Sequence, residues 1–104
     1  MPTLKERRLV LDSKFKQIPG VHVYFQPPAS VMMQYPAIRY VLADVGIIHA
    51  DDVPYIKNLR FTATVIDKDP DSAVAEALSN FKGCSYNRTY SADNLNHFVF
   101  DITI

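Results

Sequence analysis

The sequence predicts a single α+β domain with the element order α-β-β-β-α-β-β. Its sheet is expected to be mostly antiparallel, with a mixed sheet as the alternative, and both helices should lie on one face. Three observations predict it: two segments carry apolar residues at helical spacing, the segments between and after them alternate with period two, and strands follow one another directly. The chain has 104 residues, 48% of them apolar and 21% charged, so one core is expected. One domain therefore spans residues 1–104.

The first element expected is an amphipathic helix over residues 4–17. Thr3 and Glu6 form a capping-box pattern at its start, and Pro19-Gly20 supplies the stop. The apolar stripe that should face a sheet consists of Leu4, Leu11, Phe15 and Ile18, with Val10 beside them.

Three strands are expected next. Residues 21–25, "VHVYF", alternate with period two and end before two prolines, and a second strand follows in "AIRYVLADV" at 37–45. The segment "GIIHADDVPY" at 46–55 is expected to be a turn or an extended tip. The third strand is "NLRFTATVID" at 58–67, in which β-branched and aromatic residues dominate.

The period then changes to that of a helix. Asp69 is placed to cap it, Pro70 suits its first position and Gly83 ends it. Its buried stripe is expected to be Val74, Ala77, Leu78 and Phe81.

Two final strands, at 84–92 and 95–104, are joined around "ADN". The second of these strands places on one face Phe98, Phe100, Ile102 and Ile104.

Charge and cysteine content exclude several classes of protein. Eleven basic and eleven acidic residues cancel, so nucleic acid is not expected as the main partner, while self-association is mildly favoured. Cys84 is the only cysteine, which excludes an intrachain disulfide and a cysteine-rich zinc site. The apolar run near the N-terminus, "LVL", is too short for a signal or a membrane span. A cytoplasmic, soluble protein without a membrane partner is expected.

Candidate chemistry is sparse. Asp67, Asp69 and Asp71 resemble the opening of an EF-hand loop, but Ser72 and Leu78 stand where that loop needs glycine and glutamate. A helix start rich in hydrogen-bond acceptors explains the same residues. We therefore expect no metal, no cofactor and no catalytic group, and the protein is not expected to be an enzyme.

The single cysteine, the histidines and the aspartates near His49 do not alter the expectation that the protein has no catalytic or metal site. Cys84 follows the end of a helix, where nothing lowers the pKa of a thiol, so a buried apolar role is expected. Asp51 and Asp52 lie close to His49, but adjacent strand residues point to opposite faces. The histidines His22, His49 and His97 lack metal-ligand spacing, and His22 and His97 should lie on the non-core face of their strands.

Apolar and aromatic residues outside the core pattern are the unusual feature. Two interpretations are compatible with each other. In one, the two segments that carry these residues cover one end of the sheet. In the other, they form contact surface, since Met and Tyr are enriched at interfaces and proline stiffens an exposed segment. The candidate interface residues are Pro27, Pro28, Met32, Met33, Tyr35, Ile47, Ile48, Asp51, Asp52 and Tyr55.

Three stretches carry a resemblance to a known family: "VYFQPPASVMMQYPAIRY", "YIKNLRFTATVIDKDPDS" and "NRTYSADNLNHFVFDITI". They contain a P-P-x-S-x-x-M-x-Y-P segment, an I-D-x-D-P-D-S helix entry and an A-D-N-L-N-H segment. Over residues 20–104 the chain resembles the tail terminator or tail completion proteins of long-tailed bacteriophages. The element order is also similar to that of lambda-type tail terminators.

The resemblance implies a virion protein assembled in the host bacterial cytoplasm. Such a protein forms a ring, a hexamer, on the last disc of the tail tube, stops tube polymerisation and offers its other surface to the head-tail connector. Its partners would be other copies of itself, the tail tube protein and connector proteins. In "ADNLNH" we prefer a turn role for Asp93, Asn94 and Asn96 over a contact along the ring.

Two alternatives remain open. One is a head-tail adaptor or another neck protein. The other is a small ligand-binding or hydrolytic α+β domain that uses His22, His97 and Asp101, which could share one strand face.

Overall fold

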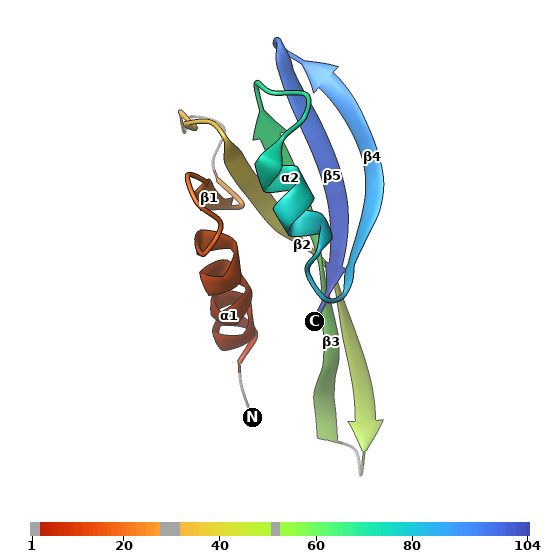
Figure 1. The fold of residues 1–104 in the computed structure, drawn as a ribbon. Coiled ribbons are helices and arrows are strands. Elements are labelled where there is room, and N and C mark those ends of the chain that lie inside the picture. The colour runs from red at the N-terminus through yellow and green to blue at the C-terminus, as the bar shows by residue number, and fades with distance from the viewer. Residues whose placement is uncertain (1–2, 28–31, 51–52) are drawn as a thin grey trace.

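Two helices pack on one face of a five-stranded sheet, as the computed structural model of the chain shows (Figure 1). The structure describes residues 3–27, 32–50 and 53–104. The element order is α-β-β-β-α-β-β, which confirms the α+β fold expected from the sequence. Neither of the helices described is long and apolar enough to cross a membrane.

The sheet has the strand order β1-β2-β3-β5-β4. The short edge strand β1 runs parallel to β2, and every other neighbouring pair is antiparallel, so the sheet is mixed. The strand bounds are β1 His22–Phe25, β2 Ala37–Ala50, β3 Val53–Asp67, β4 Cys84–Ala92 and β5 Leu95–Thr103.

The first helix, α1 (Leu4–Lys16), begins as the capping pattern predicts. The Glu6 amide donates a 3.1 Å hydrogen bond to the Thr3 hydroxyl. The apolar stripe is shorter than expected, because Leu11, Phe15 and Ile18 are buried whereas Leu4 and Val10 are 42% and 59% exposed. Leu4 belongs to the first turn and lines, together with the core residues Leu59 and Phe61, a cavity of about 290 Å³.

The second helix, α2 (Ala73–Ser79), begins later than the sequence suggested. Its N-cap is Ser72 instead of Asp69, because the Ser72 hydroxyl accepts a 3.2 Å hydrogen bond from the Ala75 amide. The carboxylates of Asp67 and Asp69 each accept from the amide two residues ahead, which holds the preceding segment in turns. Pro70 therefore lies in a turn and not in the helix.

The end of α2 also differs from the expectation. The helix closes at Asn80, its C-cap, and Gly83 lies just before β4 with φ of +80°. On the expected stripe Val74 and Leu78 are buried, while Ala77 and Phe81 are half-buried and pack against the core.

The core is built around Tyr40 of β2. Its ring meets Phe15 of α1 edge-on at 5.1 Å and Phe61 of β3 at 5.8 Å. Phe15 also stacks on Phe81 after α2, with ring centroids 5.8 Å apart. These contacts bring both helices to the same face of the sheet, where aromatic pairs add to the stabilisation from burial.

The β4–β5 hairpin is the one the sequence predicts. Asp93 and Asn94 both have positive φ, 54° and 63°, as a two-residue type I′ turn requires. The Asn96 amide donates to the carbonyls of Asp67 and Lys68. Asp93 and Asn94 thus form the turn, as we preferred, whereas Asn96 belongs to β5 and its side chain bonds the end of β3 and the residue after it.

The largest departure from expectation lies between β2 and β3. The segment 46–55 was expected to be a turn or an extended tip, with the third strand starting at residue 58. Instead β2 continues to Ala50 and β3 already begins at Val53, so the two strands form one long hairpin. Period-two alternation is hidden here because apolar residues occur on both faces of the hairpin.

Candidate assembly interface

The long hairpin extends past the rest of the sheet. Strand β5 pairs with β3 only from Arg60 to Asp67, and β1 pairs with β2 only from Ala37 to Tyr40. Beyond these partners the hairpin has only two strands among the residues that the structure describes. We call its described residues, 45–50 and 53–58, the arm; Figure 1 shows it projecting at the bottom, away from α2.

The arm exposes branched apolar side chains. Ile47 and Ile48 are 54% and 50% exposed, and Val53 is 49% exposed. Because Ile47 and Ile48 are neighbours on one strand, they point to opposite faces of the ribbon. Both faces of the arm are therefore available for apolar contact.

An arm of this kind has little intrinsic stability. A two-stranded hairpin is marginal in water unless a third strand or another surface covers it. Six residues of strand make it roughly 20 Å long. Ile47, Ile48 and Val53 are already about half covered. Burial of the remainder against a partner would stabilise both the arm and the contact, by roughly 0.8–1.5 kcal/mol for each side chain.

The proline-rich connection, of which the structure describes residues 26–27 and 32–36, lies at the other end of β2. It leads into Ala37, whereas the arm begins at Val45 of the same strand, so roughly 26 Å of strand separates the two segments. Met32 is 91% exposed and Tyr35 36%, while Pro27 and Met33 are half-buried. Of the two methionines, Met32 is thus the accessible one.

The structure does not describe all the predicted interface residues. Pro28, Asp51 and Asp52 lie outside the described residues, and Tyr55 is placed only by its backbone, opposite Ile48 in the register. The structure brings Ile47, Ile48 and Tyr55 into the arm and places Pro27, Met32, Met33 and Tyr35 in the proline-rich connection. The predicted set is therefore two surfaces at opposite ends of the sheet.

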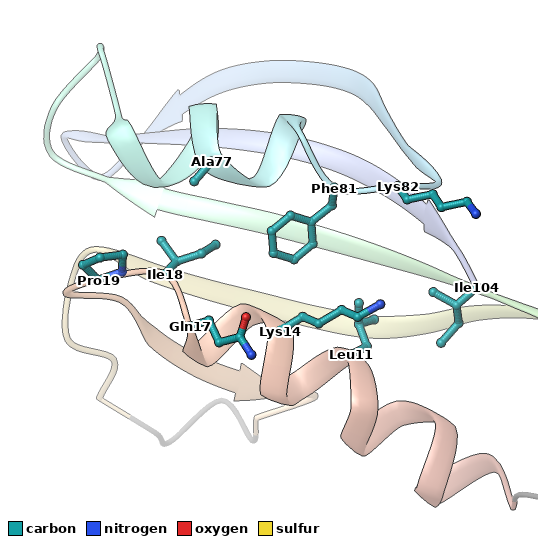
Figure 2. Close-up of a pocket in the computed structure, with 9 residues that line it drawn as sticks. All are labelled: Leu11, Lys14, Gln17, Ile18, Pro19, Ala77, Phe81, Lys82 and Ile104. Atoms are coloured by element: carbon teal, nitrogen blue, oxygen red, sulfur yellow. The ribbon is translucent and has the colours of Figure 1, made fainter.

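A cleft between the helices was not predicted from the sequence. It has a volume of about 460 Å³, and Figure 2 shows its residues coming from α1 on one side and from α2 and the turn after it on the other. The walls are mostly apolar, with two exposed lysines: Leu11, Lys14, Gln17, Ile18, Pro19, Ala77, Phe81, Lys82 and Ile104. We call it the α1–α2 cleft.

A sequence signal for this cleft existed but was weak. Lys14 and Gln17 stand one helical turn apart on α1, beside the stripe of Leu11 and Ile18. Their proximity to Phe81 depends on how two helices distant in sequence lie on the sheet. No local pattern records that placement.

The face of the sheet opposite the helices holds the residues of the rival hydrolytic interpretation. His22 is exposed on the edge strand β1, and His97 lies three strands away in the row His22, Ala37, Ile66, His97. Asp101 is four residues from His97 on β5, roughly 13 Å along the strand. The three side chains therefore share a face but do not converge on a common site.

The polar groups on that face are engaged in other ways. Asp101 accepts hydrogen bonds from the Asn87 amide at 2.9 Å and the Thr62 hydroxyl at 3.4 Å. The His97 ring stacks on Tyr90 at 4.7 Å, and its buried Nε2 has no hydrogen-bond partner among the described residues. Within the described parts of the chain, no three His, Cys, Asp or Glu side chains gather as metal ligands do.

Cys84 is half-buried, less enclosed than the sequence suggested, and it packs against the core. Burial raises the pKa of its thiol, and the negative charge of Asp101 raises it further. A raised pKa disfavours the thiolate that a nucleophile requires.

Comparison with known proteins adds no family to this description. No protein-family model matches the chain, and a search of curated proteins finds no significant match.

Proposed function

We propose that the chain is a structural subunit of a phage tail, a tail terminator or completion protein that self-associates into a closed ring. The observation that carries the proposal is the arm, a two-stranded ribbon that exposes Ile47, Ile48 and Val53 beyond the sheet. Exposed branched side chains on a ribbon without a third strand favour a partner that covers them.

The arrangement suits a contact that repeats from one copy to the next. A ring built by rotation uses two different surfaces on each subunit, one that reaches and one that receives. The arm and the proline-rich connection lie at opposite ends of β2, so a subunit can contact different neighbours at its two ends. A net charge of zero leaves no overall repulsion between copies.

The tail role rests on the resemblance of residues 20–104 to tail terminator proteins. In that role the ring sits on the last disc of the tail tube and blocks further addition of tube subunits. Its other axial face then receives the head-tail connector. The partners proposed are further copies of the chain, the tube protein and the connector proteins, and the work requires no catalytic group.

A head-tail adaptor is the closest rival role. Electron microscopy of particles that lack the protein distinguishes the two, since loss of a terminator leaves overlong or unjoined tails. Heads that leak DNA beside normal tails would contradict the terminator role.

The self-association step is tested with the double variant Ile47→Asp/Ile48→Asp. Charged side chains on both faces of the arm should abolish oligomers in sedimentation velocity, while circular dichroism shows the native fold. The matched control is Val10→Asp, which alters a 59% exposed apolar residue on α1 away from the arm. Normal oligomers of the double variant, or a wild-type chain that stays monomeric with and without tube protein, would overturn the proposal.

A further inference from the structure

We infer that the α1–α2 cleft binds an anionic single-chain amphiphile, a carboxylate that carries an unbranched alkyl chain. The inference goes beyond the proposed self-association and does not depend on it. It follows from three observations: the apolar lining of the cleft, the positive charge at one end of it, and the engagement of the charge in the second cavity of the molecule.

The interior of the cleft can bury an alkyl chain. Its volume of about 460 Å³ lies in the range of small-molecule sites, which are mostly apolar with a few polar groups. Leu11 and Ile18 of its wall are buried, and Phe81 is half-buried. Figure 2 shows the Phe81 ring projecting toward α1 across this space. An alkyl chain, which has no polar group to satisfy, fits such a lining.

The two ends of the cleft differ in polarity. Lys14 of α1 and Lys82, which follows α2, border the cleft, and both are exposed. Figure 2 shows both lysine side chains extending toward Ile104, whereas Ile18 and Pro19 lie at the other end. The cleft is therefore apolar at one end and basic at the other, which matches a ligand with an apolar tail and a charged head.

The positive charge of the cleft is not neutralised by a carboxylate of the described residues. Neither Lys14 nor Lys82 forms an ion pair there, whereas Lys16 is paired with Asp12 at 2.7 Å. Each helix ends beside the cleft, where its last carbonyl groups amount to about half a negative charge. Two ammonium groups outweigh these two helix ends, so an anionic head group is favoured over a cationic one.

The second cavity, of about 290 Å³, matches such a ligand less well. It also has two basic residues, Lys5 and Arg8. The Arg8 guanidinium, however, lies 4.3 Å from the centroid of the Phe25 ring and donates to the Tyr40 hydroxyl at 3.1 Å. That hydroxyl in turn donates to the carboxylate of Asp12, whose negative charge offsets part of the charge of Arg8. The contacts of the described residues therefore assign an anionic amphiphile to the larger cleft.

Titration calorimetry of the wild-type chain with decanoate tests the inference. We expect saturable binding at a single site. Octanoate should bind roughly tenfold more weakly, because each buried methylene group strengthens binding about fourfold. Decyltrimethylammonium has the same chain length and a cationic head, and it should bind at least roughly tenfold more weakly than decanoate.

Charge reversal assigns the binding to one of the two cavities. Lys14→Glu/Lys82→Glu should weaken decanoate binding by roughly tenfold or more. Both side chains are exposed, so circular dichroism should show the native fold. The matched control is Lys5→Glu/Lys68→Glu, which changes the net charge equally and alters a lysine of the second cavity. This control should bind decanoate as the wild type does.

The position of the tail is tested by NMR. Nuclear Overhauser effects should connect the alkyl chain of decanoate with the methyl groups of Ile18 and Ala77, which line the cleft. Effects to Leu4 and Leu42 instead would place the ligand in the second cavity and overturn the inference.

Each outcome of the titrations decides the inference. Decanoate binding that the cleft variant loses and the control retains supports it. No binding to the wild type, equal binding by the cleft variant, a larger loss in the control, or equally tight binding of decyltrimethylammonium overturns it. Because calorimetry measures the site in the wild-type chain whatever its oligomeric state, failure of this inference leaves the proposed function unaffected.

Discussion

The hydroxyl of Tyr40 donates a 2.6 Å hydrogen bond to the carboxylate of Asp12 and thereby joins β2 to α1. The Arg8 guanidinium donates to the same hydroxyl oxygen at 3.1 Å, and Lys16 lies 2.7 Å from the other Asp12 oxygen. These contacts hold α1, which forms one wall of the cleft, in a defined position on β2.

Removing the hydroxyl of Tyr40 should destabilise the fold. Tyr40→Phe leaves the buried carboxylate of Asp12 without one donor and should lower the free energy of unfolding by about 1–3 kcal/mol in urea denaturation. Tyr90→Phe, which removes the hydroxyl of a 42% exposed ring, is the matched control and should change stability little. Equal stability of Tyr40→Phe and the wild type would show that the hydrogen bond does not hold α1.

The contact between Tyr40 and Asp12 should also make the free energy of unfolding depend on pH in the alkaline range. Burial raises the pKa of Tyr40 from 10.0 to about 12, and the hydrogen bond to Asp12 adds to the rise. The folded chain therefore retains a proton that the unfolded chain releases, and this stabilisation is present below pH 10 and is lost as the pH rises toward 12. The difference in unfolding free energy between the wild type and Tyr40→Phe should narrow over that interval. A constant difference would contradict the assignment.

At low pH the stability should depend on the ionisation of Asp12, whose pKa is shifted in the opposite direction. Burial alone would raise the pKa of its carboxyl, but hydrogen bonds from Lys16 and Tyr40 and the nearby positive charges outweigh it, so the pKa is lowered from 3.8. The stabilisation is therefore present above pH 3.8 and is lost as the pH falls through the lowered pKa of the folded chain. Asp12→Asn should reduce this acid dependence in the same urea measurements.

Two glycines with similar backbone angles should differ in their tolerance of alanine. Gly20 and Gly83 have φ of +75° and +80°, but a Cβ at Gly83 would overlap the Thr103 carbonyl oxygen whereas one at Gly20 would meet nothing within 4 Å. Gly20→Ala should cost about 1–2 kcal/mol for the left-handed backbone alone. Gly83→Ala should cost clearly more in thermal or urea unfolding. Equal costs would argue against the close approach of β5 to the turn before β4.

The proline-rich connection can be tested apart from the arm. Met32→Asp/Tyr35→Ala alters the exposed residues of this segment and should leave the unfolding free energy within about 0.5 kcal/mol of the wild type. Particle assembly should fail nevertheless, because this end of the sheet would face a neighbouring subunit or the tube. Normal assembly of this double variant would show that the proline-rich connection is not part of the interface. Met33→Asp is the contrasting variant, since its half-buried side chain should make the change destabilising.

Much of the fold could be predicted from local patterns. Thr3 at the start of α1, the alternation of Phe98, Phe100 and Ile102 in β5 and the Asp93-Asn94 turn each act through residues close in sequence. Such local patterns predict an element independently of how the rest of the chain packs.

What the sequence did not predict depends on distant contacts or on competing local bonds. The N-cap of α2 is Ser72 and not the predicted Asp69, because the side chains of Asp67 and Asp69 accept hydrogen bonds from backbone amides before the helix. Several residues in this segment can act as a cap, and the local sequence does not distinguish among them. An extended tip at 46–55 was among the expectations, but the continuation of β2 and β3 into it was not, because Ile47 and Ile48 break the alternation of a half-buried strand. The cleft was missed because Lys14 and Lys82 lie 68 positions apart and meet only through the packing of both helices.

Native mass spectrometry of the wild-type chain, alone and with tail tube protein, tests the central claim most directly. A closed ring predicts one discrete species, which for six copies of the 11.8 kDa chain has a mass of about 71 kDa. The arm variant Ile47→Asp/Ile48→Asp should show only the 11.8 kDa monomer. A wild-type chain that remains at 11.8 kDa under both conditions would contradict the claim that the arm is a docking element between copies.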